Sequence, residues 1–194
     1  MVDNFKLISD FITFDSEDDF YFMQIMQRAK ENPDIGCNNK IIKTYYIRSK
    51  KYLNEHESEI KSLCDLFNAR AYIHLTKRSF KKTCLLTLNT IAANLLSDTV
   101  RGTYKAYNHA CGIQYDTKTK KWIIDIDSKD TNEVIRVKNI IHECMPVGDK
   151  VLLEVPTKNG IHLITTPFNL KEFREVCTDE LDIHKNNPTV LYMQ

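Results

Sequence analysis

The chain has 194 residues, of which 42% are hydrophobic and 27% charged. This composition argues against disorder and predicts one compact unit or a core with a smaller lobe. Lysine and arginine number 27 and aspartate and glutamate 26, so the net charge of +1 excludes a generally basic nucleic-acid-binding surface. No apolar run reaches the ~20 residues of a membrane span, so no membrane partner is expected.

The cysteines and the first residues predict the compartment. The six cysteines are scattered without a C-x-x-C pair, which favours reduced thiols over a disulfide framework. Residues 1–10 mix charged and apolar side chains and lack the basic and apolar regions of a signal peptide. We therefore expect a cytoplasmic protein, in a bacterial or phage-infected host cell. The oligomeric state is not predicted.

Residues 1–115 predict an α/β lobe. Three acids crowd residues 17–19, where the dipole of a helix N-terminus favours anions, and Pro33 and Gly36 follow. The predicted elements in chain order are a helix from Ser16 to about residue 32, a strand over 41–48, a helix over 50–68, a strand over 69–76, a helix over 78–98 and a helix over 101–111. The helix over 78–98 has the clearest apolar stripe, formed by Leu85, Leu88, Ile91, Ala92, Leu95 and Leu96.

Residues 116–194 predict a different arrangement. The expected elements are a strand over 121–127, a helix capped by Asp130 or Thr131, a strand over 151–155, its hairpin partner over 161–166, a short helix capped by Asn169 and a last strand over 189–193. This β-α-β-β-α-β order is that of the ferredoxin-like fold, an antiparallel sheet with both helices on one face. The predicted class is therefore α+β, with an RRM-like palm in the C-terminal half packed against the N-terminal lobe as one compact unit.

An acidic pair ends the strand predicted over 121–127. Asp125 and Asp127 are two residues apart, and such residues point to the same face of a strand. Adjacent carboxylates repel each other unless a cation lies between them, and Mg²⁺ takes oxygen ligands while keeping positions for substrate phosphates. The pattern predicts a Mg²⁺ or Mn²⁺ site. The alternative is that the strand ends here and both acids face water.

The hairpin that follows carries a second cluster. Lys158 supplies a cation, Gly160 allows a close approach of the backbone, and His162 lies on the returning strand. Because the first and third strands of the predicted sheet are central neighbours, we expect His162 to reach an anion held at the two aspartates. The alternative is a turn that needs glycine and a histidine that is hydrogen-bonded within the sheet.

Together the two motifs resemble the catalytic core of the archaeo-eukaryotic primase superfamily, the primase-polymerases. Asp125 and Asp127 match the family's Asp-x-Asp motif, and Gly160 and His162 match its motif of a small residue, any residue and histidine. The resemblance, which covers residues 121–194, implies an RRM-like palm and two-metal nucleotidyl transfer in DNA replication. It further implies that the aspartates hold Mg²⁺ or Mn²⁺ over a nucleoside triphosphate whose phosphates contact the histidine, with DNA or RNA as template.

The family's third motif, an acid after a hydrophobic residue on a late strand, has no clean match. The strand predicted over 189–193 carries no acid. Asp182, which follows Leu181, and Glu154 on the hairpin are the candidates for a third metal ligand. The resemblance therefore implies either an active nucleotidyltransferase or a degenerate relative that retains nucleotide binding.

Two further segments are candidate phosphate contacts. Arg78 lies in a basic group at the start of the long predicted helix, and a helix N-terminus with nearby cations binds phosphate well. The polar segment 184–188, with Lys185, is a candidate loop at the active face. The alternatives are a solvated helix face and a plain turn.

Other classes of function compete with nucleotidyl transfer. His74 begins an H-x-T pattern on a predicted strand, and with His162 it resembles the paired histidines of the 2H phosphoesterases, which act without metal. In the second copy two residues separate His162 from Thr165, so the pattern there departs from the family's. A structural zinc site would use His109 with Cys111 and His142 with Cys144, although both pairs fall on predicted helices, where residues two apart point away from each other. The remaining alternative is a non-enzymatic adaptor, phage-encoded, whose acids are surface residues.

Overall fold

The structure is a computed structural model that describes residues 1–177 and 181–194. The strands and helices of its first part are β1 (Val2–Asp3), α1 (Phe5–Phe11), β2 (Asp19–Arg28), η1 (Pro33–Ile35), β3 (Asn39–Ile47), α2 (Lys50–Glu55), α3 (Glu57–Leu66), β4 (Arg70–Ile73), β5 (Arg78–Ser79), α4 (Phe80–Leu96), η2 (Val100–Lys105) and α5 (Ala106–Ile113). Those that follow are η3 (Thr117–Thr119), β6 (Trp122–Ile126), α6 (Thr131–Glu143), β7 (Val151–Pro156), β8 (Ile161–Thr165), α7 (Leu170–Val176), β9 (Asp182–His184) and β10 (Thr189–Met193).

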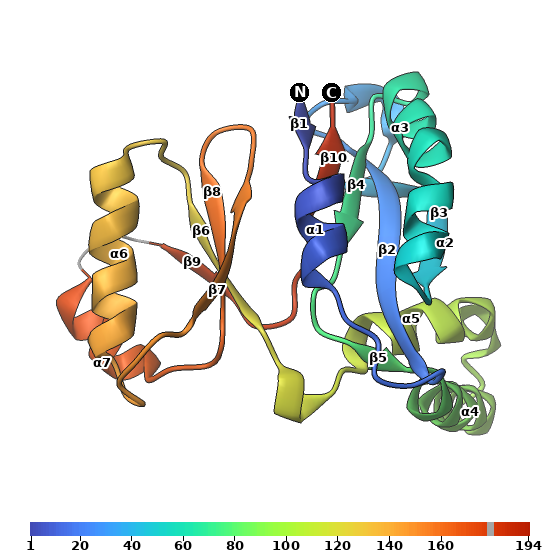
Figure 1. Cartoon of the computed structure of the whole chain (residues 1–194). Coiled ribbons are helices and arrows are strands. Elements are labelled where there is room, and N and C mark those ends of the chain that lie inside the picture. The colour runs from blue at the N-terminus through green and yellow to red at the C-terminus, as the bar shows by residue number, and fades with distance from the viewer. Residues whose placement is uncertain (178–180) are drawn as a thin grey trace.

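The fold is α+β, with two antiparallel sheets side by side (Figure 1). The first sheet has the strand order β1-β10-β4-β2-β3, with β5 paired to β2, and the second has the order β7-β8-β6-β9. Helices α1, α2 and α3 cover one face of the first sheet, whereas α6 and α7 lie on the outer side of the second. No helix among the described residues is long and apolar enough to cross a membrane.

The prediction of a helix that begins near Ser16 is wrong, because residues 19–28 form strand β2. Tyr21 and Met23 enter the core beneath α1 to α3, while Phe20 and Phe22 enter a second cluster with α5 on the opposite face. Successive side chains of this segment are thus buried on opposite faces of the sheet, which is typical of a strand that is covered on both faces. Two of the acids that suggested a helix start, Asp18 and Asp19, have other partners.

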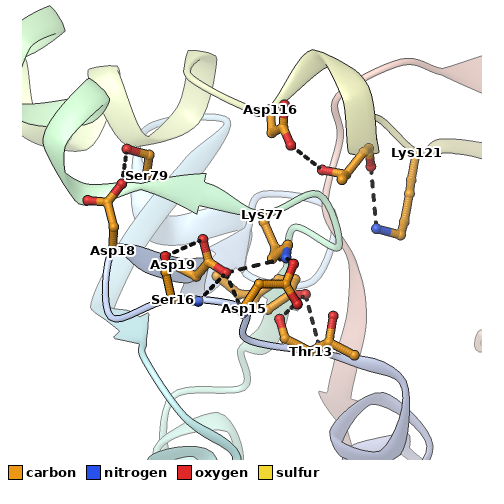
Figure 2. A network of polar contacts seen from close by, with 11 residues as sticks. Thr13, Asp15, Ser16, Asp18, Asp19, Lys77, Ser79, Asp116 and Lys121 are labelled. Atoms are coloured by element: carbon orange, nitrogen blue, oxygen red, sulfur yellow. Dashed lines mark hydrogen bonds and ion pairs between the residues drawn. The ribbon is translucent and has the colours of Figure 1, made fainter.

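Those acids tie the start of β2 to the β4–β5 connection (Figure 2). The Asp19 carboxylate accepts hydrogen bonds from the backbone of Asp15 at 2.7 Å and from Lys77 at 3.3 Å. The Asp18 carboxylate accepts from the Ser79 hydroxyl and, at 2.8 Å, from the amide of Lys81. The acids therefore neutralise the buried Lys77 and hold the start of β2 against β5 and the start of α4.

Elements with strong local signals form where they were predicted. Strands β3, β6, β7 and β8 lie within one or two residues of the predicted ranges. Asp130 caps α6 by accepting from the amide of Asn132, and Asn169 caps α7 by accepting from the amide of Lys171. The predicted helix over 50–68 is divided into α2 and α3 at His56.

The apolar stripe of α4 is largely uncovered. Leu88 is 63% exposed and Leu96 90%, whereas Thr83 on the opposite side is buried. The helix packs through that opposite side, with Phe80 stacked on Phe20 at a ring-centroid distance of 4.3 Å. The periodicity of the stripe thus predicted the helix and not its burial.

The last strand joins the other sheet. The strand predicted at 189–193 exists as β10, but it pairs with β1 and β4 of the first sheet instead of completing the second. The fourth strand of the second sheet is β9, for which no strand was predicted and which ends at the first residue of the polar segment 184–188. The chain therefore crosses between the sheets twice, through residues 114–121 and through residues 185–188.

Candidate functional site

The two faces of the second sheet differ in chemistry. On β6, Ile124 and Ile126 face the core beneath α6 and α7, while Ile123 packs into the core of the first part. Side chains alternate along a strand, so Asp125 shares the inward face of Ile123. This face is apolar where it packs on the first part and becomes polar at Asp125.

A row of polar residues crosses this face. Asp125 is directly opposite His162 on β8 and opposite Asp182 on β9. The His162 Nε2 atom lies 3.4 Å from Asp125 Oδ1. Two residues before Asp125 on β6, Ile123 is opposite His184 on β9, so the His184 side chain lies on the same face of the sheet. The predicted neighbours Asp125 and His162 are therefore in contact.

These residues line a cavity of about 780 Å³ between the two sheets. Asp127 and Lys158 lie at its wall beside Asp125 and His162, although Asp127 follows the end of β6 and is exposed. The segment predicted as an active-face loop contributes Asn187 and Pro188 to the lining. By contrast, the Nζ atom of Lys185 lies 5.3 Å from the ring centroid of Trp122, and Lys185 is not among the described residues that line the cavity.

Gly160 is buried and has a packing role; it is not among the described residues that line the cavity, although its neighbour Asn159 is. A Cβ atom at this position would lie 1.9 Å from the carbonyl oxygen of Ile126 and 2.6 Å from the amide nitrogen of Ser128. The close backbone approach predicted for Gly160 is thus made to the end of β6. It holds the 157–160 turn against the strand that carries Asp125.

The first sheet supplies the opposite wall of the cavity. The face of this sheet that carries Arg28 and Tyr72 is covered by α4 and α5 only near the start of β2. Arg28 donates a hydrogen bond to the Tyr72 hydroxyl at 3.4 Å, and Arg70 is paired with Glu31. The cavity therefore has an acidic and imidazole wall facing a wall with two guanidinium groups. Sequence reasoning missed Arg28, whose hydrogen-bond partner Tyr72 lies 44 residues away in the chain.

The Asp125 carboxyl is held in its charged form. Its contact with His162 lowers the pKa of this carboxyl, against the opposing effect of burial, and the nearby His184 lowers it further. Asp125 is therefore ionised at neutral pH. Its contribution to stability is present above pH 3.8 and is lost as the pH falls through the lower pKa of the folded state.

The contacts of His162 join the two sheets. Its Nδ1 atom lies 2.8 Å from the hydroxyl oxygen of Thr189, the first residue of β10. Thr189 is fully buried and is paired with Ile73 in the first sheet. The imidazole is thus held between a hydroxyl of one sheet and a carboxylate of the other.

Two of the predicted site residues lie elsewhere. Arg78, predicted at a phosphate, is only 1% exposed and donates to the carbonyl oxygens of Cys111 and Thr76 and to the Asn186 side chain, at 2.9, 2.7 and 3.1 Å. Glu154, a candidate third metal ligand, pairs with Lys138 and lines a separate cavity near α1. Both assignments are corrected, since neither residue is among the described residues that line the cavity between the sheets. Asp182 remains as the candidate third acid.

The polar side chains that line the cavity include both carboxylates and imidazoles. Among the described residues, no group of three or more His, Cys, Asp and Glu side chains is arranged to hold a metal ion. Mg²⁺ and Mn²⁺ bind proteins through one or two carboxylates and complete their coordination with water and phosphate oxygens, and Asp125 and Asp127 supply donors of this kind. Cys111 and Cys144, the zinc candidates, are buried in separate clusters.

His74 lies outside the cavity and is not suited to acid–base catalysis at neutral pH. Burial, with a contribution from the nearby Arg78 guanidinium, lowers the pKa of His74 to about 3. Its ring packs against Phe22 at a centroid distance of 5.7 Å. His74 is not among the described residues that line the cavity with His162.

A pH-dependent loss of stability follows from this burial. The native state keeps His74 neutral down to about pH 3, whereas the unfolded chain takes up a proton below pH 6.5, so the unfolding free energy falls as the pH drops. Between pH 6.5 and pH 5 the fall due to His74 is about 2 kcal/mol. We expect urea unfolding of His74→Gln to lack this part of the pH dependence. The exposed His109→Gln should keep it, and equal slopes for the two variants would contradict the burial of His74.

Comparison with known proteins finds no match to this chain among protein-family models, curated proteins or solved structures.

Proposed function

We propose that the cavity between the sheets binds a nucleoside triphosphate with Mg²⁺ or Mn²⁺ and transfers a nucleotidyl group onto DNA or RNA, in the manner of a primase-polymerase. A degenerate relative that retains only nucleotide binding is the weaker form of the same proposal. The observation that carries it is the convergence of the two motifs, with Asp125 Oδ1 and His162 Nε2 3.4 Å apart in one cavity.

The arrangement of the second sheet supports an RRM-like, ferredoxin-like palm. Its strand order of β7-β8-β6-β9 makes the first and third strands of the unit central neighbours. The helices α6 and α7 lie together on the side away from the cavity. Both features are typical of the ferredoxin-like arrangement. The part of the inward face around Asp125 lines the cavity and is open to a ligand.

Each site residue has a role in this proposal. A divalent cation bound by the Asp125 and Asp127 carboxylates supplies charge neutralisation for the triphosphate and for the leaving group. His162 donates a hydrogen bond to a phosphate oxygen, and Lys158 adds positive charge at the rim. Asp182 is paired with Asp125 across β6 and β9 and lines the same cavity, so it stays the candidate for a further acid near the cation.

The size and charge of the cavity also fit this ligand. A volume of about 780 Å³ lies within the range of small-molecule sites. Arg28 and Lys30 line it without an ion-pair partner among the described residues, so they can meet the negative charge of a polyphosphate or nucleic acid. The metal-independent phosphodiesterase hypothesis has less support, since His74 and His162 do not share this cavity.

Equilibrium binding of a fluorescent nucleoside triphosphate tests the proposal. We expect saturable binding in the presence of Mn²⁺ that is lost on addition of EDTA, because the triphosphate is held through the cation. Phosphodiester hydrolysis that survives EDTA would favour the 2H-type enzyme instead. The absence of any saturable signal with Mn²⁺ and each of the ribo- and deoxyribonucleotides would leave the adaptor hypothesis.

A further inference from the structure

We infer that Thr189 is a positioning residue that fixes the tautomer and the direction of the His162 imidazole; the consequence for ligand binding rests on the proposed function. Thr189 and His162 belong to different sheets and are 27 positions apart in the chain, yet their side chains lie 2.8 Å apart. Thr189 is fully buried, so its hydroxyl does not exchange this partner freely for water.

Hydrogen-bonding capacity decides which imidazole nitrogen carries the hydrogen. A neutral imidazole has one N–H and one lone pair, and an ionised carboxylate can only accept. Nε2 faces the Asp125 carboxylate at 3.4 Å, so the hydrogen belongs on Nε2; the opposite tautomer would turn two lone pairs toward each other. Nδ1 is then an acceptor, and the Thr189 hydroxyl is the group that donates to it.

This tautomer has a consequence at the cavity wall. It points an N–H into the space beside Asp125, where the proposal puts a triphosphate. When cation binding engages the Asp125 carboxylate, the same N–H is available to a phosphate oxygen without a change of tautomer. The Thr189 hydroxyl therefore acts through His162 and does not itself need to touch the ligand.

Removal of the hydroxyl should release the imidazole. In Thr189→Val the donor to Nδ1 is lost at nearly constant volume, so the two tautomers become mixed and the ring is free to turn. The measurement is ¹⁵N NMR of histidine-labelled protein, with His162 assigned by comparison with His162→Gln. We expect the wild type and Thr189→Ser to show an unprotonated Nδ1 and a protonated Nε2, and Thr189→Val to move both signals toward their average.

Ligand binding provides the second readout. Loss of one buried hydrogen bond that orients the donor should weaken Mn²⁺-dependent triphosphate binding about tenfold in Thr189→Val, and Thr189→Ser should restore it. Thr165→Val is the matched control, because Thr165 is also fully buried, lies on the same strand as His162, and has no hydrogen-bond partner for its hydroxyl among the described residues. It should change neither readout.

Three results would overturn the inference. One is a wild-type protein with the hydrogen on Nδ1, a measurement that needs no variant to fold. Another is a Thr189→Val protein with a lower melting temperature but an unchanged tautomer and unchanged binding, since this marks a merely structural threonine. The third is a failure of Thr189→Ser to restore the tautomer. If the wild type binds no triphosphate, the proposed function fails while the NMR spectra still decide the role of Thr189.

Discussion

Asp125→Asn should abolish metal-dependent nucleotide binding while leaving the fold intact. The substitution keeps the size of the side chain and removes the negative charge that the cation needs, so we expect the affinity for a nucleoside triphosphate with Mn²⁺ to fall by roughly 100-fold or more. The free energy of unfolding should change by no more than about 1 kcal/mol, because the side chain is half-buried and its contact with His162 is partly screened by solvent. Titration of labelled nucleotide and urea unfolding of the same preparation measure the two quantities.

Glu154→Gln is the matched control for this experiment. Glu154 is an acid of the same sheet, but it pairs with Lys138 and lines the separate cavity near α1. Its substitution should leave nucleotide affinity unchanged. The metal-site hypothesis is contradicted if Asp125→Asn binds nucleotide as tightly as Glu154→Gln, or if Asp125→Asn unfolds while the folded fraction binds normally.

Arg78→Met should destabilise the protein strongly, by about 3 kcal/mol or more. The guanidinium donates to two backbone carbonyl groups and to Asn186, which belongs to the second crossing between the sheets. Burial lowers the pKa of Arg78 to about 10, so it is charged at neutral pH and its removal leaves these acceptors without a donor. Equilibrium unfolding in urea measures the loss.

The exposed Lys82→Met, four residues along the chain, controls for the loss of a positive charge near the start of α4. It should change stability by less than about 0.5 kcal/mol. Nucleotide binding by the folded fraction of Arg78→Met should stay near that of the wild type, since Arg78 is not among the described residues of the cavity. A variant that is fully stable but loses nucleotide binding would restore the phosphate role first expected of Arg78.

Local signals predicted much of the second sheet and its motifs. The caps Asp130 and Asn169, the hairpin turn with Gly160 and the alternating strands depend on residues close together in the chain, so they can be recognised without coordinates. The meeting of Asp125 with His162 followed from a strand order that the element sequence suggested. The contact between Asp125 and His162 is therefore the part of the candidate site that could be predicted from the sequence.

Long-range contacts account for what was missed. The segment after Ser16 forms strand β2 instead of a helix because Phe20 and Phe22 pack in an apolar cluster with side chains from residues 80–111. Strand β10 joins the first sheet because β1 and β4, far away in the chain, offer it partners on both edges. For the same reason the roles of Arg78, Arg28 and Thr189 could not be predicted, since each depends on a partner more than 25 residues away.

The most direct test of the metal-bound triphosphate is a crystal structure of the protein with Mn²⁺ and a non-hydrolysable nucleoside triphosphate, with the metal located by anomalous diffraction. We predict a manganese peak about 2.1 Å from carboxylate oxygens of both Asp125 and Asp127, with a phosphate oxygen within hydrogen-bonding distance of His162 Nε2. A triphosphate bound elsewhere, or a manganese ion that contacts neither aspartate at saturating nucleotide, would contradict the account.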